Sequence, residues 1–332
     1  MNTRDFIEKV PLSVIAGAKG RYTAIIINTT GNNSITESLG FLYTHSKYKI
    51  GVIETDKAGL NETIAICSTT GAKLIVLGDD AIPEFNLVTP VSGFSCALIS
   101  TGSYNGKKDN ILDLIIENNR VTDFSHIGFQ QYKYDPDRLH LLREKYFESL
   151  RLGLLRENIT SAEPLIRGKE YLFFDMNSIR VSDFPENHEK SPNGLYAEEA
   201  CQIGRYIGMN QNLRICYIFG YKPESLPGSS SSQLAAEIIW HISEGIASSV
   251  DEDPSLSEKD DYFHRKIVSM GEEGQDMIFV TSSFSGRWWM EIPEFKNNRT
   301  RFVPCSLSDY QCACNGEVPL RWIFFFQKIN PN

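Results

Sequence analysis

Asp175 and Asn177 are the pair of side chains in this chain with the clearest potential for chemistry. They follow the apolar run 171–174, in the sequence Phe173-Phe174-Asp175-Met176-Asn177. Carboxylate and amide oxygens are ligands of hard divalent cations, but a single carboxylate rarely holds a metal ion by itself. Asp175 is therefore either a remaining ligand of one weakly held ion or a carboxylate that accepts hydrogen bonds from backbone amides at a strand end. We favour the second interpretation.

Short apolar strands and intervening helices are the elements that would position this pair. Strands are predicted at residues 23–27, 49–53, 74–77, 96–100, 171–175, 213–219 and 277–281. Apolar residues at helical spacing predict helices at 135–158, 196–207 and 233–246, and Gly208 is expected to end the second of these. This alternation indicates an α/β fold with a mainly parallel central sheet that is covered on both faces. We predict a single domain over residues 1–332, with residues 274–332 as a C-terminal extension packed on it.

Composition excludes several classes of protein. The chain has 332 residues and a net charge of −9, without the clustered Lys and Arg that phosphate binding requires, so we expect no nucleic-acid partner. No stretch approaches about 18 consecutive apolar residues, so we expect no membrane span. Seven scattered cysteines, an odd number, fit a reducing cytoplasm better than a disulfide framework.

Three groups of residues around Asp175 occur together and in order. They are Phe174-Asp175-Met176-Asn177, then Arg180 with Ser182-Asp183, then Asn193-Gly194-Leu195-Tyr196-Ala197-Glu198-Glu199-Ala200. This series resembles the strand, loop and helix of the ureohydrolase superfamily, which includes arginase, agmatinase and formiminoglutamase. The resemblance runs from about residue 74 to residue 246 and is nearest to the formiminoglutamase-like branch. It implies a three-layer, arginase-like α/β fold.

The resemblance also implies where metal ligands would lie. In the family, six side chains from three strand-end motifs hold two manganese ions, and a bridging hydroxide attacks a guanidinium or formimino carbon. In this chain Asp175 alone keeps its ligand position. Non-ligating or weakly ligating residues occupy the other five ligand positions: Ala81 after Asp80 in the first motif, Thr101, Ser103 and Asn105 in the second, and Asn177 in the third. Gly220, beyond the next strand, occupies the position of the acidic residue that binds the cationic end of the substrate in the family.

This set of residues leads us to expect a protein that has lost its chemistry. One carboxylate cannot offset the charge of two divalent ions, because unpaired charge in a partly desolvated crevice costs several kcal/mol per ion. We expect a ureohydrolase-like pseudoenzyme without a metal cofactor, acting as a cytoplasmic scaffold or binding protein for an unknown protein partner or small molecule. The alternative is a manganese-dependent formimidoylglutamase or guanidino hydrolase that acts on linear amidine C–N bonds.

Other residues with chemical potential have simpler interpretations. Loop residues could rebuild a site for a single metal ion, but loop carboxylates more often are solvated or cap helices; these residues are Asp79, Asp80, Glu84, Asp183, Glu186 and His188. We expect His126 to be a packing residue rather than a base, and Cys305, Cys312 and Cys314 to be free thiols rather than zinc ligands. Trp288 and Trp289 either anchor a partner or close the core, and we favour the core. A homo-oligomer is expected from the family resemblance.

Overall fold

The structure is a computed structural model that describes residues 6–80, 85–86, 88–102, 110–221, 228–256, 261–270 and 276–331. The chain divides into two compact units. The first comprises Met1–Leu142 with Phe147–Ser249, and the second comprises Arg143–Tyr146 with Val250–Asn332. The boundary that we placed at residue 274 falls inside the second unit, and the packing of residues 274–332 on the rest of the chain stays a prediction.

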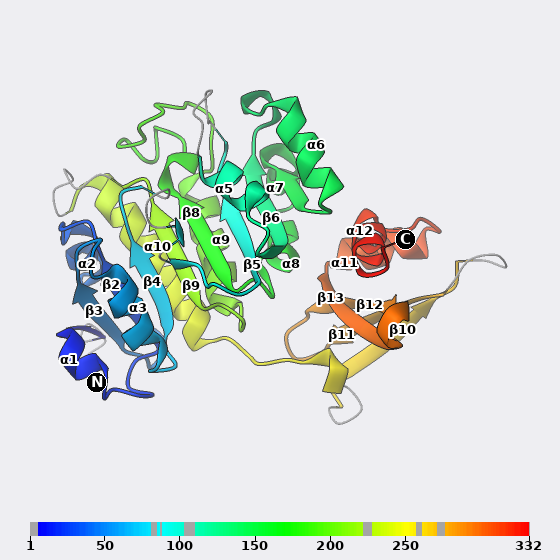
Figure 1. The fold of residues 1–332 in the computed structure, drawn as a ribbon, viewed down its shortest axis with the longest axis horizontal. Helices are drawn as coiled ribbons and strands as arrows, with labels where there is room; N and C mark the ends of the chain where they lie inside the picture. Colours follow the sequence, from blue (N-terminus) through cyan, green and yellow to red (C-terminus); the bar gives the residue numbers. More distant parts are fainter. Residues whose placement is uncertain are drawn as a thin grey trace. The chain divides into compact units, whose positions relative to one another are not determined.

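A nine-stranded parallel sheet forms the centre of the described part of the first unit (Figure 1). Its order is β1-β3-β2-β4-β9-β8-β5-β6-β7. The strands are β1 (Ile7–Lys9), β2 (Ala24–Asn28), β3 (Ile50–Glu54), β4 (Lys73–Leu77), β5 (Phe94–Ile99), β6 (Val121–Phe129), β7 (Glu148–Arg151), β8 (Tyr171–Asp175) and β9 (Ile215–Phe219). Every pairing in the sheet is parallel, which confirms the predicted fold class.

Helices cover both faces of this sheet, as its doubly apolar strands require. In β2, Ile26 packs into one core and Ile25 and Ile27 pack into the other. The first core includes side chains of α2 (Ser34–Leu39), α7 (Leu152–Glu157), α8 (Ala162–Ile166), α9 (Ala197–Met209) and α10 (Ser230–Ala247). The second includes α1 (Leu12–Ile15), α3 (Leu60–Ser68), α5 (Ile111–Glu117) and α6 (Pro136–Glu144). Short 3-10 turns η1 (Gln131–Lys133), η2 (Ile159–Ser161) and η3 (Met176–Ser178) complete the described elements of this unit.

Two helix predictions were wrong in informative ways. Residues 135–158 are not one helix, because Tyr146 adopts a positive φ of 52° and the chain then forms β7 before α7 begins. Gly208 does not end α9, which continues to Met209. A Cβ at Gly208 would lie 2.0 Å from the carbonyl oxygen of Ile242, so this glycine permits the close approach of α9 and α10.

The second unit is built on an antiparallel sheet of four strands in its described part, in the order β10-β11-β12-β13. They are β10 (Phe263–Val268), β11 (Met277–Ser282), β12 (Trp288–Glu294) and β13 (Arg299–Cys305), accompanied by η4 (Pro254–Leu256), η5 (Phe295–Asn297), α11 (Leu307–Cys314) and α12 (Leu320–Ile329). Trp288 stacks on Tyr310 of α11, with ring centroids 4.8 Å apart. Trp289 packs edge-on against Phe263, 5.8 Å away. Both tryptophans therefore help to form the core of this unit, as we favoured.

Across the described residues, no helix combines the length and the apolar character that a membrane span needs.

Candidate functional site

Asp175 lies at the carboxyl end of β8, in the middle of the parallel sheet between β9 and β5. Its side chain is buried, with the residue 8% exposed. One carboxylate oxygen, Oδ1, accepts hydrogen bonds from the Asn177 backbone N–H at 2.9 Å and from the Asn177 Nδ2 at 3.1 Å. Two N–H donors therefore face one of the two oxygens of this carboxylate.

The surroundings of Asp175 disfavour its charged form. Burial raises the pKa of Asp175 to about 7; the nearby Glu189 adds to this effect, while the Asn177 hydrogen bonds and the Lys133 ammonium oppose it. Lys133 is itself paired with Glu189, at 3.2 Å from Nζ to Oε2. A divalent cation needs an ionised ligand, so a proton and a cation would compete for this carboxylate.

Gly220, directly after β9, lies against the same pair of side chains. Its φ of +80° is in the left-handed region that favours glycine. A Cβ at this position would lie 2.4 Å from the Asn177 Nδ2 and 2.8 Å from the Asp175 Oδ1. The space that any side chain at position 220 would need is therefore filled by Asp175 and Asn177.

The loop that follows β8 fixes the orientation of Asn177. The Oδ1 of Asn177 accepts a hydrogen bond from the His188 backbone N–H at 2.8 Å. The fully buried Asn187 donates to the carbonyl oxygens of Asn177 at 3.0 Å and Ile179 at 2.6 Å. Because the amide oxygen points to the loop and the amide nitrogen points to Asp175, Asn177 presents no oxygen beside the carboxylate.

The carboxyl end of β5 carries the predicted second motif. Thr101 is buried, and its carbonyl oxygen accepts a hydrogen bond from the Gln130 backbone N–H at 3.0 Å. Ser103 and Asn105 lie outside the described residues. The nearby His126 is fully buried in β6: its Nε2 donates to the Ser100 carbonyl oxygen at 3.1 Å, and its Nδ1 accepts from the Tyr134 hydroxyl. Burial lowers the pKa of His126 to about 3, so this ring is a neutral packing group.

The carboxyl end of β4 carries the first motif, and Ala81 and Glu84 lie outside the described residues. Asp80 is exposed, and its backbone carbonyl accepts a hydrogen bond from the Tyr217 hydroxyl at 2.7 Å. Burial raises the pKa of Asp79, and the neighbouring Asp80 charge adds to this effect while Lys57 opposes it. The Asp79 carbonyl oxygen accepts from the Gly220 N–H at 3.2 Å, which ties the ends of β4 and β9 together.

Asp183, a candidate for a relocated metal site, has a structural role instead. One of its carboxylate oxygens pairs with the Arg180 Nε at 2.8 Å, and the other accepts the Ala197 N–H at 2.9 Å, which caps α9. His188 is exposed.

These residues do not fit a pair of manganese ions. In the described part of the chain, no group of three or more His, Cys, Asp or Glu side chains is arranged to hold a metal ion, and this includes the three C-terminal cysteines. Among the residues that the structure describes, Asp175 supplies one carboxylate, two N–H groups of Asn177 point at it, and Gly220 offers no side chain. The sequence identified which residues occupy these positions, but it did not reveal that Asn177 turns its amide nitrogen onto Asp175.

Solved structures of formiminoglutamase and arginase are similar to this fold. Formiminoglutamase from Trypanosoma cruzi, in a crystal with Mn²⁺, superposes with a TM-score of 0.59 at 14% identity, covering 71% of this chain and 98% of that one. Formimidoylglutamase from Bacillus subtilis gives a TM-score of 0.59 at 14% identity, covering 75% and 92% of the two chains. Arginase from Medicago truncatula gives 0.53 at 13% identity, covering 70% and 94%. No protein-family model matches the sequence, and no curated protein matches it significantly. The likeness shows the arginase-like fold, which confirms the prediction.

Proposed function

We propose that this protein is a non-catalytic member of the ureohydrolase superfamily that acts as a cytoplasmic scaffold or binding protein. The observation that carries the proposal is the contact among Asp175, Asn177 and Gly220. The Asn177 amide satisfies the one carboxylate and, with that carboxylate, fills the volume that an acidic side chain at position 220 would occupy. Metal binding and substrate gripping are thus obstructed by the same small group of atoms.

Metal content and turnover test this proposal together. Protein purified without chelator should contain no stoichiometric manganese by elemental analysis, and it should not hydrolyse formiminoglutamate, arginine or agmatine when Mn²⁺ is added. About two equivalents of manganese, with hydrolysis of formiminoglutamate that Asp175→Ala abolishes, would establish the alternative of a metal-dependent formimidoylglutamase.

Asn177→Asp provides a sharper form of the same test. The substitution restores the second carboxylate of the third motif, but it places two carboxylates side by side in a buried position, where like charges oppose ionisation. Because Ala81, Thr101, Ser103 and Asn105 are unchanged, we expect the variant to remain inactive with Mn²⁺. Turnover by this variant would show that the site is one substitution away from function and that our account of the crevice is incorrect.

The partner is proposed only by class: an unidentified protein or a small molecule, with a homo-oligomer as a further proposal. Seven scattered free cysteines support a reducing compartment for this role. Light scattering coupled to size-exclusion chromatography tests the oligomer directly, and a monomer at micromolar concentration would contradict it.

A further inference from the structure

A cavity of about 350 Å³ lies at the amino ends of β4, β9 and β8. Its lining includes Lys73, Ile215 and Tyr171, which are the first residues of these three strands. The strands are parallel, and Asp175 is the last residue of β8, so this edge of the sheet is opposite to the edge that carries Asp175. The volume is at the lower end of the range of about 300–1,000 Å³ for ligand pockets. The cavity is therefore of a size for a small molecule, separate from the ureohydrolase crevice.

The polar side chains in this cavity favour an anion. Among its described lining residues two are cationic, Lys73 and Arg214, and none is a carboxylate. The Lys73 Nζ donates to the Gln211 carbonyl oxygen at 2.7 Å, and Gln211 does not line the cavity, so Lys73 adds positive charge near the cavity rather than a donor within it. The Arg214 Nε lies 3.1 Å from a carboxylate oxygen of Glu170. A guanidinium has five N–H donors, so one carboxylate partner does not exhaust its capacity.

Tyr171 supplies a third donor. Its ring is buried, and burial raises the pKa of its hydroxyl while the Arg214 charge and hydrogen bond oppose that shift. The hydroxyl therefore keeps its proton at neutral pH. Because the oxygen accepts from the Arg214 guanidinium, the hydroxyl proton is left to donate to another acceptor.

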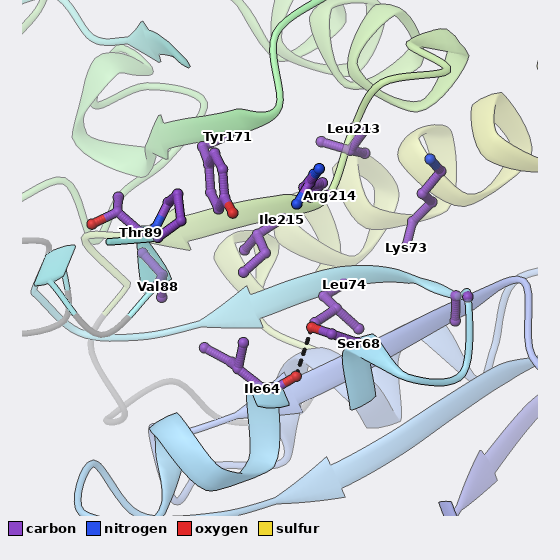
Figure 2. Close-up of a pocket in the computed structure, with 13 residues that line it drawn as sticks. Ile64, Ser68, Lys73, Leu74, Val88, Thr89, Tyr171, Leu213, Arg214 and Ile215 are labelled. Carbon is purple, nitrogen blue, oxygen red and sulfur yellow. Dashed lines mark hydrogen bonds between the residues drawn. The ribbon is translucent and has the colours of Figure 1, made fainter. Parts of the chain in front are cut away.

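The opposite wall of the cavity is apolar. Figure 2 shows Ile64 of α3 and Leu74 of β4 across the cavity from Tyr171 and Arg214. The hydroxyl of Ser68 donates to the Ile64 carbonyl oxygen at 2.7 Å, so this polar group is satisfied within α3. A ligand here would contact a guanidinium and a hydroxyl on one side and aliphatic carbon on the other.

We propose that this cavity binds a small carboxylic acid anion with an apolar body. The carboxylate lies at the Tyr171 hydroxyl and the Arg214 guanidinium, and the hydrocarbon packs on Ile64 and Leu74. Arg214 gives the geometry for a paired hydrogen bond to a carboxylate, which a neutral amide of the same shape cannot reproduce. This inference does not depend on the loss of the metal site.

Isothermal titration calorimetry of the full-length protein with hexanoate and with hexanamide tests the proposal. We expect hexanoate to bind and hexanamide to bind at least about tenfold more weakly, since loss of charge-assisted hydrogen bonds costs about a tenfold factor or more. Arg214→Gln should weaken hexanoate binding by about tenfold, and Tyr171→Phe should weaken it by a smaller factor. The Arg214 side chain is 66% exposed, so Arg214→Gln should fold normally.

Two control variants locate the site. Arg21→Gln removes another exposed arginine that is paired with a glutamate, Glu8, at 2.6 Å, and it should leave hexanoate binding unchanged. Asp175→Ala alters only the opposite edge of the sheet and should also leave it unchanged. Equal binding of acid and amide would indicate a merely apolar cavity and overturn the proposal. Unaltered binding by Arg214→Gln, or no binding of hexanoate at millimolar concentration, would overturn it as well.

Discussion

Asp175→Asn should stabilise the protein at neutral and alkaline pH. The pKa of Asp175 is raised from an ordinary value near 3.8 to about 7 by burial. Between these two values the unfolded chain has lost the Asp175 proton and the folded chain has kept it. The folded state therefore binds more protons, and the stability of the wild type falls as the pH rises through this window. An asparagine at this position has no charge to bury, and its Oδ1 can accept both Asn177 hydrogen bonds.

The magnitude follows from the size of the shift. One pKa unit corresponds to about 1.4 kcal/mol. The raised pKa of Asp175 therefore lowers the free energy of unfolding by about 4 kcal/mol at pH 8 and by about 1.7 kcal/mol at pH 5. The free energy of unfolding of Asp175→Asn minus that of the wild type should therefore grow by about 2.5 kcal/mol between pH 5 and pH 8. Above pH 8 the difference should level off.

Urea unfolding followed by circular dichroism at several pH values measures this difference. Asp56→Asn is the matched control, because Asp56 is exposed and also accepts a backbone hydrogen bond, from Gly59 at 2.8 Å. It should show no comparable growth with pH. A variant at Asp175 that is less stable than the wild type at pH 8, or a difference that does not change with pH, would refute the reasoning. Stabilisation of the wild type by Mn²⁺ that the variant loses would show instead that Asp175 is a metal ligand.

Three further substitutions test close contacts in the two units. Gly220→Ala should destabilise the protein by about 2–4 kcal/mol in urea unfolding, more than Gly31→Ala, which has a similar positive φ of 69° but open space around its Cβ; equal effects would mean that the contacts with Asp175 and Asn177 are unimportant. Gly208→Ala should lower the thermal midpoint clearly, because its Cβ would meet the α10 backbone at 2.0 Å; an unchanged midpoint would contradict this packing. Glu252→Ala should cost about 3 kcal/mol, since it leaves the buried Arg287, 3.7 Å away, without this carboxylate. Tryptophan fluorescence reports this last change, because three of the four tryptophans lie in the second unit, and a loss below about 1 kcal/mol would argue against a strong ion pair.

The parallel strands could be predicted because their sequence pattern is determined by burial on two faces. Runs such as 23–27 and 171–175 are apolar at nearly every position, and both lie within one residue of the observed β2 and β8. β6 lacks this pattern, since Asp123, Ser125 and His126 interrupt it, and it was not predicted. The buried His126 is tolerated because its ring finds partners on neighbouring segments, which the sequence alone does not show.

Helix boundaries failed where tertiary contacts override local preference. Leucines at helical spacing continue across residues 139–154, yet the chain makes a turn at Tyr146 and enters the sheet as β7. Glycine often ends a helix, but Gly208 lies inside α9, where its lack of a side chain allows α10 to pack closely. In both cases the deciding neighbour is distant in sequence, so a window of adjacent residues cannot contain the information.

At the candidate site, the sequence showed which residues are present but not how they contact one another. The resemblance to ureohydrolases implied that positions 177 and 220 lack the acidic side chains of the family. Nothing in the sequence indicated that the two positions depend on each other. In the structure they are linked: the Asn177 amide nitrogen lies only 2.4 Å from where a Cβ at position 220 would be. An acidic residue at 220 would displace Asn177, and an aspartate at 177 would confront the buried Asp175 with a second negative charge. An acidic residue at either position alone is therefore opposed by the other position. If the protein is non-catalytic, as we propose, a metal site here would require several coordinated substitutions rather than one.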